Sequence, residues 1–124
     1  MDYFLMARDD WRIQTERFVE LLASEWPAVK LKLIPDPQDN HAVEFRLPMK
    51  ESMVLGALNR EGSAIIYYGA LRDCAEFALW YQSVVPEAQP FLLFDEGYNC
   101  SIELKPETTA EEIIRALGGG PSTS

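Results

Sequence analysis

Histidine and cysteine are scarce in this sequence of 124 residues, which has one histidine, His41, and two cysteines, Cys74 and Cys100. A structural zinc site takes four cysteine or histidine ligands, and this chain offers three in total. Two cysteines also cannot build the disulfide framework of a small secreted domain. We therefore expect no metal and no cofactor, and we expect both cysteines to be reduced thiols in the core.

Long apolar runs are absent too. No run approaches the ~18 apolar residues that a membrane-spanning helix needs. The apolar run from Tyr3 to Ala7 is shorter than the ~7–15 apolar residues of a signal peptide, and an acid, Asp2, precedes it in place of a base. We therefore expect a protein that stays in the cytoplasm.

Basic residues are rare in the second part of the chain. Residues 73–124 hold nine acids and two bases, a net charge of −7, whereas residues 1–72 have a net charge of −2. Phosphate backbones and anionic lipid surfaces are repelled by such a charge, and a basic protein is attracted to it. The only glycine run, at 118–120, follows a predicted helix, whereas a phosphate-binding loop precedes one. The sequence therefore predicts a basic protein as the partner, and neither nucleic acid nor membrane.

The composition is that of one globular domain. Hydrophobic residues make up 48% of the chain and charged residues 25%, and a chain of this length forms a single core. Residues 118–124 carry no apolar side chain, so we expect a disordered tail there. The domain is predicted to span residues 1–117.

Three segments have the apolar spacing of helices. They span residues 10–26, 71–85 and 108–117. Asp9 or Asp10 can cap the first helix, and Pro27 ends it. Thr108 and Glu111 fit a capping box at the start of the third helix, and Gly118 ends it.

Six segments read as strands, most of them because apolar and polar residues alternate. They span residues 29–34, 41–47, 52–58, 64–68, 91–94 and 98–105. Leu33 is expected to face the core, and Glu44 and Arg46 are expected to face solvent. Segment 64–68 is apolar on both faces, which favours a central position, and Gly62 is expected to adopt a positive φ in the preceding turn.

The predicted order of elements is α-β-β-β-β-α-β-β-α. Short links between successive strands favour antiparallel pairing. We therefore predict an α+β fold, with an antiparallel sheet of about six strands and helices packed on it.

No residue pattern points clearly to catalysis. His41 has no second histidine and no cysteine near it in the sequence. The charges of Asp73 and Glu76 raise the pKa expected for the Cys74 thiol, which disfavours Cys74 as a nucleophile. We predict a protein that is not an enzyme, and a small hydrolase with a site made of carboxylates and His41 is kept as an alternative.

The acids of the last hairpin and helix form the predicted binding face. The predicted turn at residues 95–97 exposes two of them, and the following strand and helix add more of the same sign. The predicted contact residues are Asp95, Glu96, Glu103, Glu107, Glu111 and Glu112. Outward carboxylates on a rigid hairpin would match the basic side chains of a toxin. The leading hypothesis is a bacterial immunity-type inhibitor that works by binding.

The size, the acidity and the helix–strands–helix–strands–helix order resemble those of the small dimeric chaperones of type III secretion. The resemblance covers about 110 residues and includes no diagnostic motif. It implies a homodimer with exposed apolar grooves, to which Leu79 and Trp80 could contribute. A chaperone-like dimer is therefore a second alternative.

Overall fold

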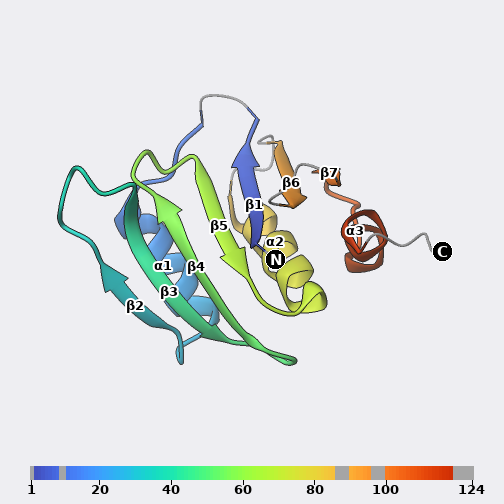
Figure 1. Ribbon diagram of the computed structural model, residues 1–124, viewed down its shortest axis with the longest axis horizontal. Coiled ribbons are helices and arrows are strands. Elements are labelled where there is room, and N and C mark those ends of the chain that lie inside the picture. The colour runs from blue at the N-terminus through green and yellow to red at the C-terminus, as the bar shows by residue number, and fades with distance from the viewer. Residues whose placement is uncertain (1, 9–10, 86–89, 96–99, 119–124) are drawn as a thin grey trace.

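In the part of the chain that the structure describes, seven strands form one antiparallel sheet and three helices accompany it (Figure 1). The computed structural model describes residues 2–8, 11–85, 90–95 and 100–118. The strands are β1 (Asp2–Ala7), β2 (Lys30–Leu33), β3 (His41–Pro48), β4 (Met53–Asn59), β5 (Ala64–Tyr68), β6 (Phe91–Asp95) and β7 (Ser101–Leu104). The helices are α1 (Thr15–Glu25), α2 (Leu71–Val84) and α3 (Ala110–Leu117). The strands lie in the order β2-β3-β4-β5-β1-β6-β7, and the predicted α+β class is confirmed.

Helices α1 and α2 lie against the same face of the sheet, and α3 lies beside α2 and β7 (Figure 1). The core fills the space between the two helices and the sheet. Phe18 of α1 and Phe77 of α2 are fully buried there, against Phe45 of β3 and Tyr67 of β5. The Tyr67 hydroxyl donates a hydrogen bond of 2.9 Å to the carbonyl oxygen of Cys74, which ties the sheet to α2.

Strand β1 is the main departure from the prediction. It pairs antiparallel with β5 on one side and with β6 on the other, so it lies inside the sheet. The sheet therefore has seven strands, where about six were predicted, and the predicted order is wrong at its start, because a strand and not a helix comes first. The sequence shows β1 only as a short apolar run, because its pairing partners lie far along the chain. The element order behind the resemblance to secretion chaperones is wrong at the same point.

Helix α1 begins at Thr15, five residues later than predicted. Gln14 is the N-cap and makes no capping hydrogen bond with its side chain, and Asp9 and Asp10 lie outside the described residues. The segment before α1 is bound to the β4–β5 turn, because the amide of Ile13 donates to the carbonyl of Gly62 at 3.0 Å. Tertiary contacts thus set the start of this helix.

The capping box of α3 is one residue later than predicted. The amide of Glu112 donates to the Thr109 hydroxyl at 3.2 Å, and the amide of Thr109 donates to Glu112 Oε1 at 2.8 Å. The Thr108 hydroxyl instead accepts a bond of 2.8 Å from the amide of Lys105. Gly118 is the C-cap, as predicted.

The absence of a side chain at Gly56 lets Phe45 and Tyr67 pack closely against β4. A Cβ atom there would lie 2.5 Å from Phe45 Cζ and 2.7 Å from Tyr67 Cβ. Gly62 has the predicted positive φ, +78°. Leu33 lies on the helix side of the sheet, opposite the buried Val43, but it is 63% exposed and not buried as predicted, because β2 is an edge strand and pairs only with β3.

Two further strand predictions are confirmed, whereas the first residues of the strand predicted at 98–105 lie outside the described part of the chain. Glu44 and Arg46 are exposed on β3, and β5 occupies the middle position of the sheet. Among the described helices, none is both long and apolar enough to cross a membrane.

Candidate functional site

Asp95 does not lie in an exposed turn. It ends strand β6 opposite Tyr3, and it is 3% exposed. Its Oδ1 accepts a hydrogen bond of 3.4 Å from the amide of Cys100. The predicted accessibility of Asp95 is therefore wrong, because its side chain falls on the helix side of the sheet. Glu96 lies outside the described residues.

Three of the other predicted contact acids already have partners within the fold. Glu103 forms an ion pair of 3.1 Å with Arg8, and Glu111 forms one of 3.7 Å with Arg72. Glu112 serves the α3 capping box. Glu107 is exposed and forms no ion pair with a described residue. The acidic segment is thus less available for a partner than its charge implies.

A different acidic surface lies where the end of α1 meets α2 and the end of β3. We call it the Trp26–Trp80 pocket, a groove of about 470 Å³. It is lined by Glu25, Trp26, Pro48, Met49, Lys50, Glu76 and Trp80. Two indoles and two carboxylates therefore share one concave surface.

Local sequence rules place the helical walls of this pocket. Pro27 cannot continue α1, so the helix ends at Glu25 and Trp26 becomes its C-cap, with its amide donating to the carbonyl of Leu22 at 2.9 Å. Glu76 and Trp80 are four residues apart on α2, so their side chains lie on the same face of that helix.

A buried carboxylate holds the third wall. Asp73 is 1% exposed, and its Oδ2 accepts hydrogen bonds from the Ser52 hydroxyl at 2.7 Å and from the amide of Glu51 at 3.0 Å. The Ser52 hydroxyl in turn accepts from the amide of Ala70 at 2.9 Å. These bonds fasten the β3–β4 turn to the start of α2, so the segment that carries Met49 stays beside α2.

The two indoles rest on the aromatic core. The ring centroids of Trp26 and Trp80 are 4.7 Å apart, with 67° between the ring planes. Phe77 lies behind both, 6.1 Å from Trp26 and 5.6 Å from Trp80. Both tryptophans are half-buried, so their positions are supported while part of each ring still faces the groove.

The electrostatics of the pocket favour a cation. Neither Glu25 nor Glu76 forms an ion pair with a described residue. The C-terminal end of α1 adds partial negative charge, and no basic residue stands in its last turn. Lys50 on the rim is the one opposing charge among the lining residues. A cation over an indole face gains ~0.5–2 kcal/mol.

His41 lies at the surface beside Glu44, and a β-bulge explains why. The bulge falls between His41 and Val43, so that consecutive residues Ala42 and Val43 are both buried and His41 turns toward the side of Glu44. His41 Nδ1 lies 3.8 Å from Glu44 Oε2. Arg60 holds the backbone nearby, donating through Nη2 to the carbonyl of His41 at 2.7 Å.

This histidine has little of what catalysis requires. A base and the group that orients it lie ~2.6–3.2 Å apart, which is shorter than the 3.8 Å found here. Cys74 is 1% exposed, and burial, together with the nearby charge of Asp73, raises the pKa of its thiol to about 12. Cys74 therefore stays a thiol at neutral pH. Cys100 is half-buried. Both cysteines are free.

Comparison with protein-family models, curated proteins and solved structures finds no match for this chain. Among the residues of the Trp26–Trp80 pocket, Trp80 was predicted to contribute to an apolar groove in the chaperone-like alternative, and none was among the predicted acidic contact residues. A weak signal was present, because a glutamate stands beside Trp26 and another stands four residues before Trp80. That signal does not say that the two helices meet.

Proposed function

We propose that this chain is a small acidic protein-binding domain that acts without catalysis, as a bacterial inhibitor of the immunity type. Its partner is a basic protein, and a lysine or arginine side chain of that partner enters the Trp26–Trp80 pocket. One observation carries the proposal: the carboxylates of Glu25 and Glu76 have no described ion-pair partner and stand beside two half-buried indoles.

The charge of the whole chain supports the same partner. A net charge of −9 steers a basic protein toward this domain and raises the rate of association at low salt. The pocket then provides an aromatic anchor of the kind that dominates binding energy at interfaces. The exposed acids of the predicted binding face, Glu103, Glu107, Glu111 and Glu112, contribute to the field, and direct contact by them remains a prediction.

We assign the domain to the cytoplasm, where disulfides are rare, because both of its cysteines are free thiols. A small hydrolase is the weaker alternative. It would depend on His41, whose distance from Glu44 exceeds that of a hydrogen-bonded pair.

The proposal is tested by titrating the full chain with N-acetyl-arginine amide and recording the indole N–H signals by NMR. The signals of Trp26 and Trp80 should shift and saturate, with a dissociation constant on the order of tens of millimolar at low salt. Trp11 packs edge-on against Phe91 outside the pocket, so its signal should stay in place. The uncharged analogue N-acetyl-citrulline amide should cause no saturating shift.

Two matched double variants locate the site. Glu25→Gln with Glu76→Gln should weaken binding of the arginine amide at least threefold. Glu61→Gln with Glu107→Gln removes the same charge from exposed positions outside the pocket and should leave binding unchanged. Equal shifts with the citrulline analogue, or equal weakening by both double variants, would contradict a cation site.

Substitution of Lys50 should change binding in the opposite direction. Its ammonium group repels an incoming cation, so Lys50→Gln should tighten binding of the arginine amide by a factor of about two to three. Weaker binding in this variant would mean that Lys50 supports the pocket and does not oppose its ligand.

A further inference from the structure

The face of the sheet away from α1 and α2 is left open by the described helices (Figure 1). Strand registers place its side chains in rows, because alternate residues of a strand point to opposite faces. One row runs through Arg46, Leu55, Tyr68 and Asp2, and the next runs through Glu44, Ala57, Ile66 and Phe4. We call this surface the open face.

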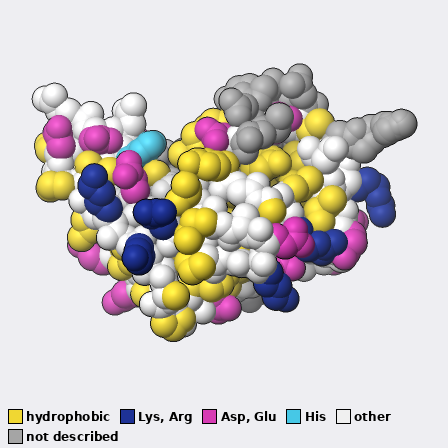
Figure 2. All heavy atoms as spheres, turned by 60° about the horizontal axis from the view of Figure 1, so that its bottom comes forward, with side chains coloured by type: hydrophobic (Ala, Val, Ile, Leu, Met, Phe, Trp, Pro, Cys, Tyr) yellow, Lys and Arg dark blue, Asp and Glu magenta, His cyan; other side chains and the backbone are white. Residues whose placement is uncertain are grey.

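The open face is apolar in its middle. Four large hydrophobic residues are exposed among those described, and three of them, Met6, Met53 and Tyr68, stand on this face. Phe4, Leu55 and Ile66 add half-buried apolar surface. Figure 2 shows hydrophobic side chains gathered in the middle of this surface, with lysine and arginine side chains toward the β2–β3 end.

The flat outline of the open face is smaller than one side of a standard interface, and its side chains add accessible area to it. Seven strands spaced ~4.8 Å apart make the sheet about 29 Å wide, and strands of about five residues make it about 17 Å long. The flat outline is therefore about 500 Å², and side chains standing on it present more accessible area than that. A standard interface takes ~800 Å² from each partner.

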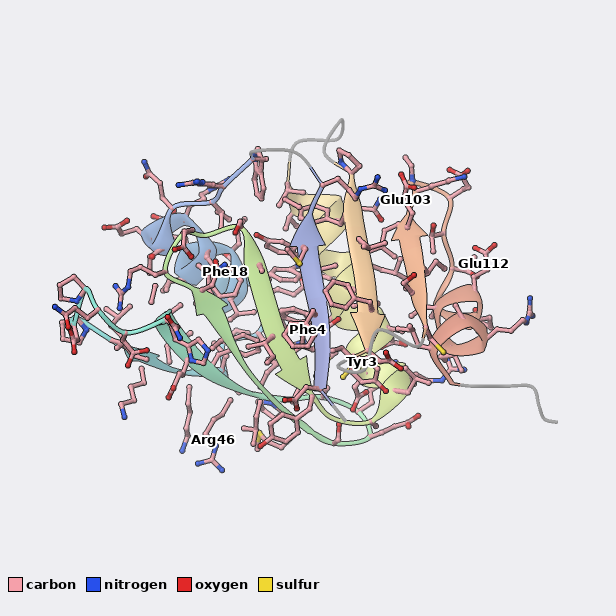
Figure 3. All side chains as sticks on the ribbon, turned by 45° about the horizontal axis from the view of Figure 1, so that its top comes forward. Tyr3, Phe4, Phe18, Arg46, Glu103 and Glu112 are labelled. Carbon is pink, nitrogen blue, oxygen red and sulfur yellow. The ribbon has the colours of Figure 1, made fainter. Side chains whose placement is uncertain are left out.

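Bases gather at one end of the open face, and the unlike charge on it is that of Asp2. The β2–β3 end carries three bases and one acid, which are Lys30, Lys32, Arg46 and Glu44. Toward the other end, Asp2 lies on β1, and Glu103 on β7 is paired with Arg8. Figure 3 shows Arg46 and Glu103 on opposite sides of Phe4, which lies in the middle of the sheet.

We propose that the open face binds the open face of a second copy of this chain. A two-fold axis parallel to the strands reverses the strand order of one copy over the other, so Arg46 on β3 of each copy lies near Asp2 on β1 of the other and one surface complements itself. A basic partner would meet like charge at Lys30, Lys32 and Arg46, which disfavours it on this face. The dimer also buries Tyr68, which stands on the middle strand, in both copies. This inference is independent of the Trp26–Trp80 pocket, whose lining residues come from α1, α2 and the end of β3.

Sedimentation equilibrium of the full chain tests the dimer. The mass should rise with concentration to twice the 14.1 kDa of one chain. Tyr68→Glu should weaken the dimer at least tenfold, because it buries two like charges near the axis. Leu33→Glu is the matched control, since Leu33 is even more exposed but lies off the open face on β2. A monomer at all concentrations up to ~1 mM, or equal weakening by both variants, would overturn the proposal.

A charge exchange tests the orientation. Arg46→Glu and Asp2→Arg should each weaken the dimer severalfold, and the double variant should restore it to within about threefold. Urea unfolding at a concentration where the chain is monomeric separates effects within one copy from effects between copies. Failure of the double variant to restore association, with folding intact, would overturn the antiparallel arrangement of charge.

Discussion

Two acidic regions of this molecule differ in what their carboxylates do. Around α3, Glu103 and Glu111 are paired with arginines and Glu112 caps the helix. At the end of α1, Glu25 and Glu76 have no described ion-pair partner and stand beside two tryptophans. Among the described residues, the region with the larger surplus of acids thus keeps one carboxylate without an ion pair or a cap, that of Glu107, whereas the pocket keeps two. The number of acids along a chain indicates the sign and strength of its electrostatic field. Folding determines which carboxylates remain available to a binding partner.

The largest expected effect comes from the core behind the pocket. Phe77 is fully buried and supports both indoles, so Phe77→Ala should lower the free energy of unfolding by about 3–5 kcal/mol. Urea unfolding followed by far-UV circular dichroism measures this. A loss below about 1 kcal/mol would mean that the pocket is not built on the core, and the contrast between the two regions would weaken.

Alkaline pH tests the same core without a mutation. Burial raises the pKa of the Cys74 thiol from 9.0 to about 12, and burial also raises the pKa of Tyr67. The folded protein therefore holds protons that the unfolded chain releases first, so stability is full below pH 9 and falls as pH rises toward 12. The Cys74 thiol alone should lower the free energy of unfolding by about 2–3 kcal/mol at pH 11. Constant stability between pH 8 and 11 in urea titrations would contradict this.

Asp73 separates a structural carboxylate from the binding ones. Asp73→Ala leaves the amide of Glu51 and the Ser52 hydroxyl without their acceptor and should lower the free energy of unfolding by about 1–3 kcal/mol. Glu76→Ala, one turn later on α2, should change it by less than about 0.5 kcal/mol. Thermal unfolding of the two variants compares their stabilities. Equal losses of stability would contradict a structural role that is specific to Asp73.

Substitutions in the capping box of α3 test whether Glu112 is engaged in capping the helix. Thr109→Ala removes the acceptor for the amide of Glu112 and should lower the free energy of unfolding by about 1 kcal/mol. Thr108→Ala removes a bond to Lys105 outside the helix and should have a smaller effect. If urea unfolding found the larger loss for Thr108→Ala, the cap would sit one residue earlier than the structure places it.

The smallest expected effects belong to the paired acids. Glu103→Gln and Glu111→Gln each break one exposed ion pair and should change the free energy of unfolding by less than about 0.5 kcal/mol. Neither should alter binding of the arginine amide by the Trp26–Trp80 pocket. Weaker binding of the arginine amide by either variant would mean that the acids of the predicted binding face take part in binding.

Local patterns predicted the parts of the fold that local forces decide. Alternation on β3 placed Glu44 and Arg46 outward, and Gly62 adopts the positive φ expected of its turn. The same patterns failed where a distant contact decides. The hydrogen bond from Ile13 to Gly62 delays α1, and pairing with both β5 and β6 makes β1 an interior strand.

The candidate site was harder to predict for the same reason. Glu25, Trp26 and Trp80 each have an ordinary local role, as the end or the side of a helix. They become a pocket only because α1 ends beside α2, and because Asp73 fastens the β3–β4 turn there. The antiparallel pairing of β6 with β7 agrees with the predicted hairpin, but Asp95, which was predicted to lie in the turn, ends β6 on the buried side, so its carboxylate is not at the surface.

Neighbouring residues and composition suffice to predict the α+β class, most of the strands, the helix ends at Pro27 and Gly118, and the sign of the charge. They do not predict that β1 lies inside the sheet, which carboxylates pair with arginines, or which carboxylates stay beside the indoles. Those outcomes depend on distances between residues far apart in the chain, and such distances arise when the sheet and its helices pack.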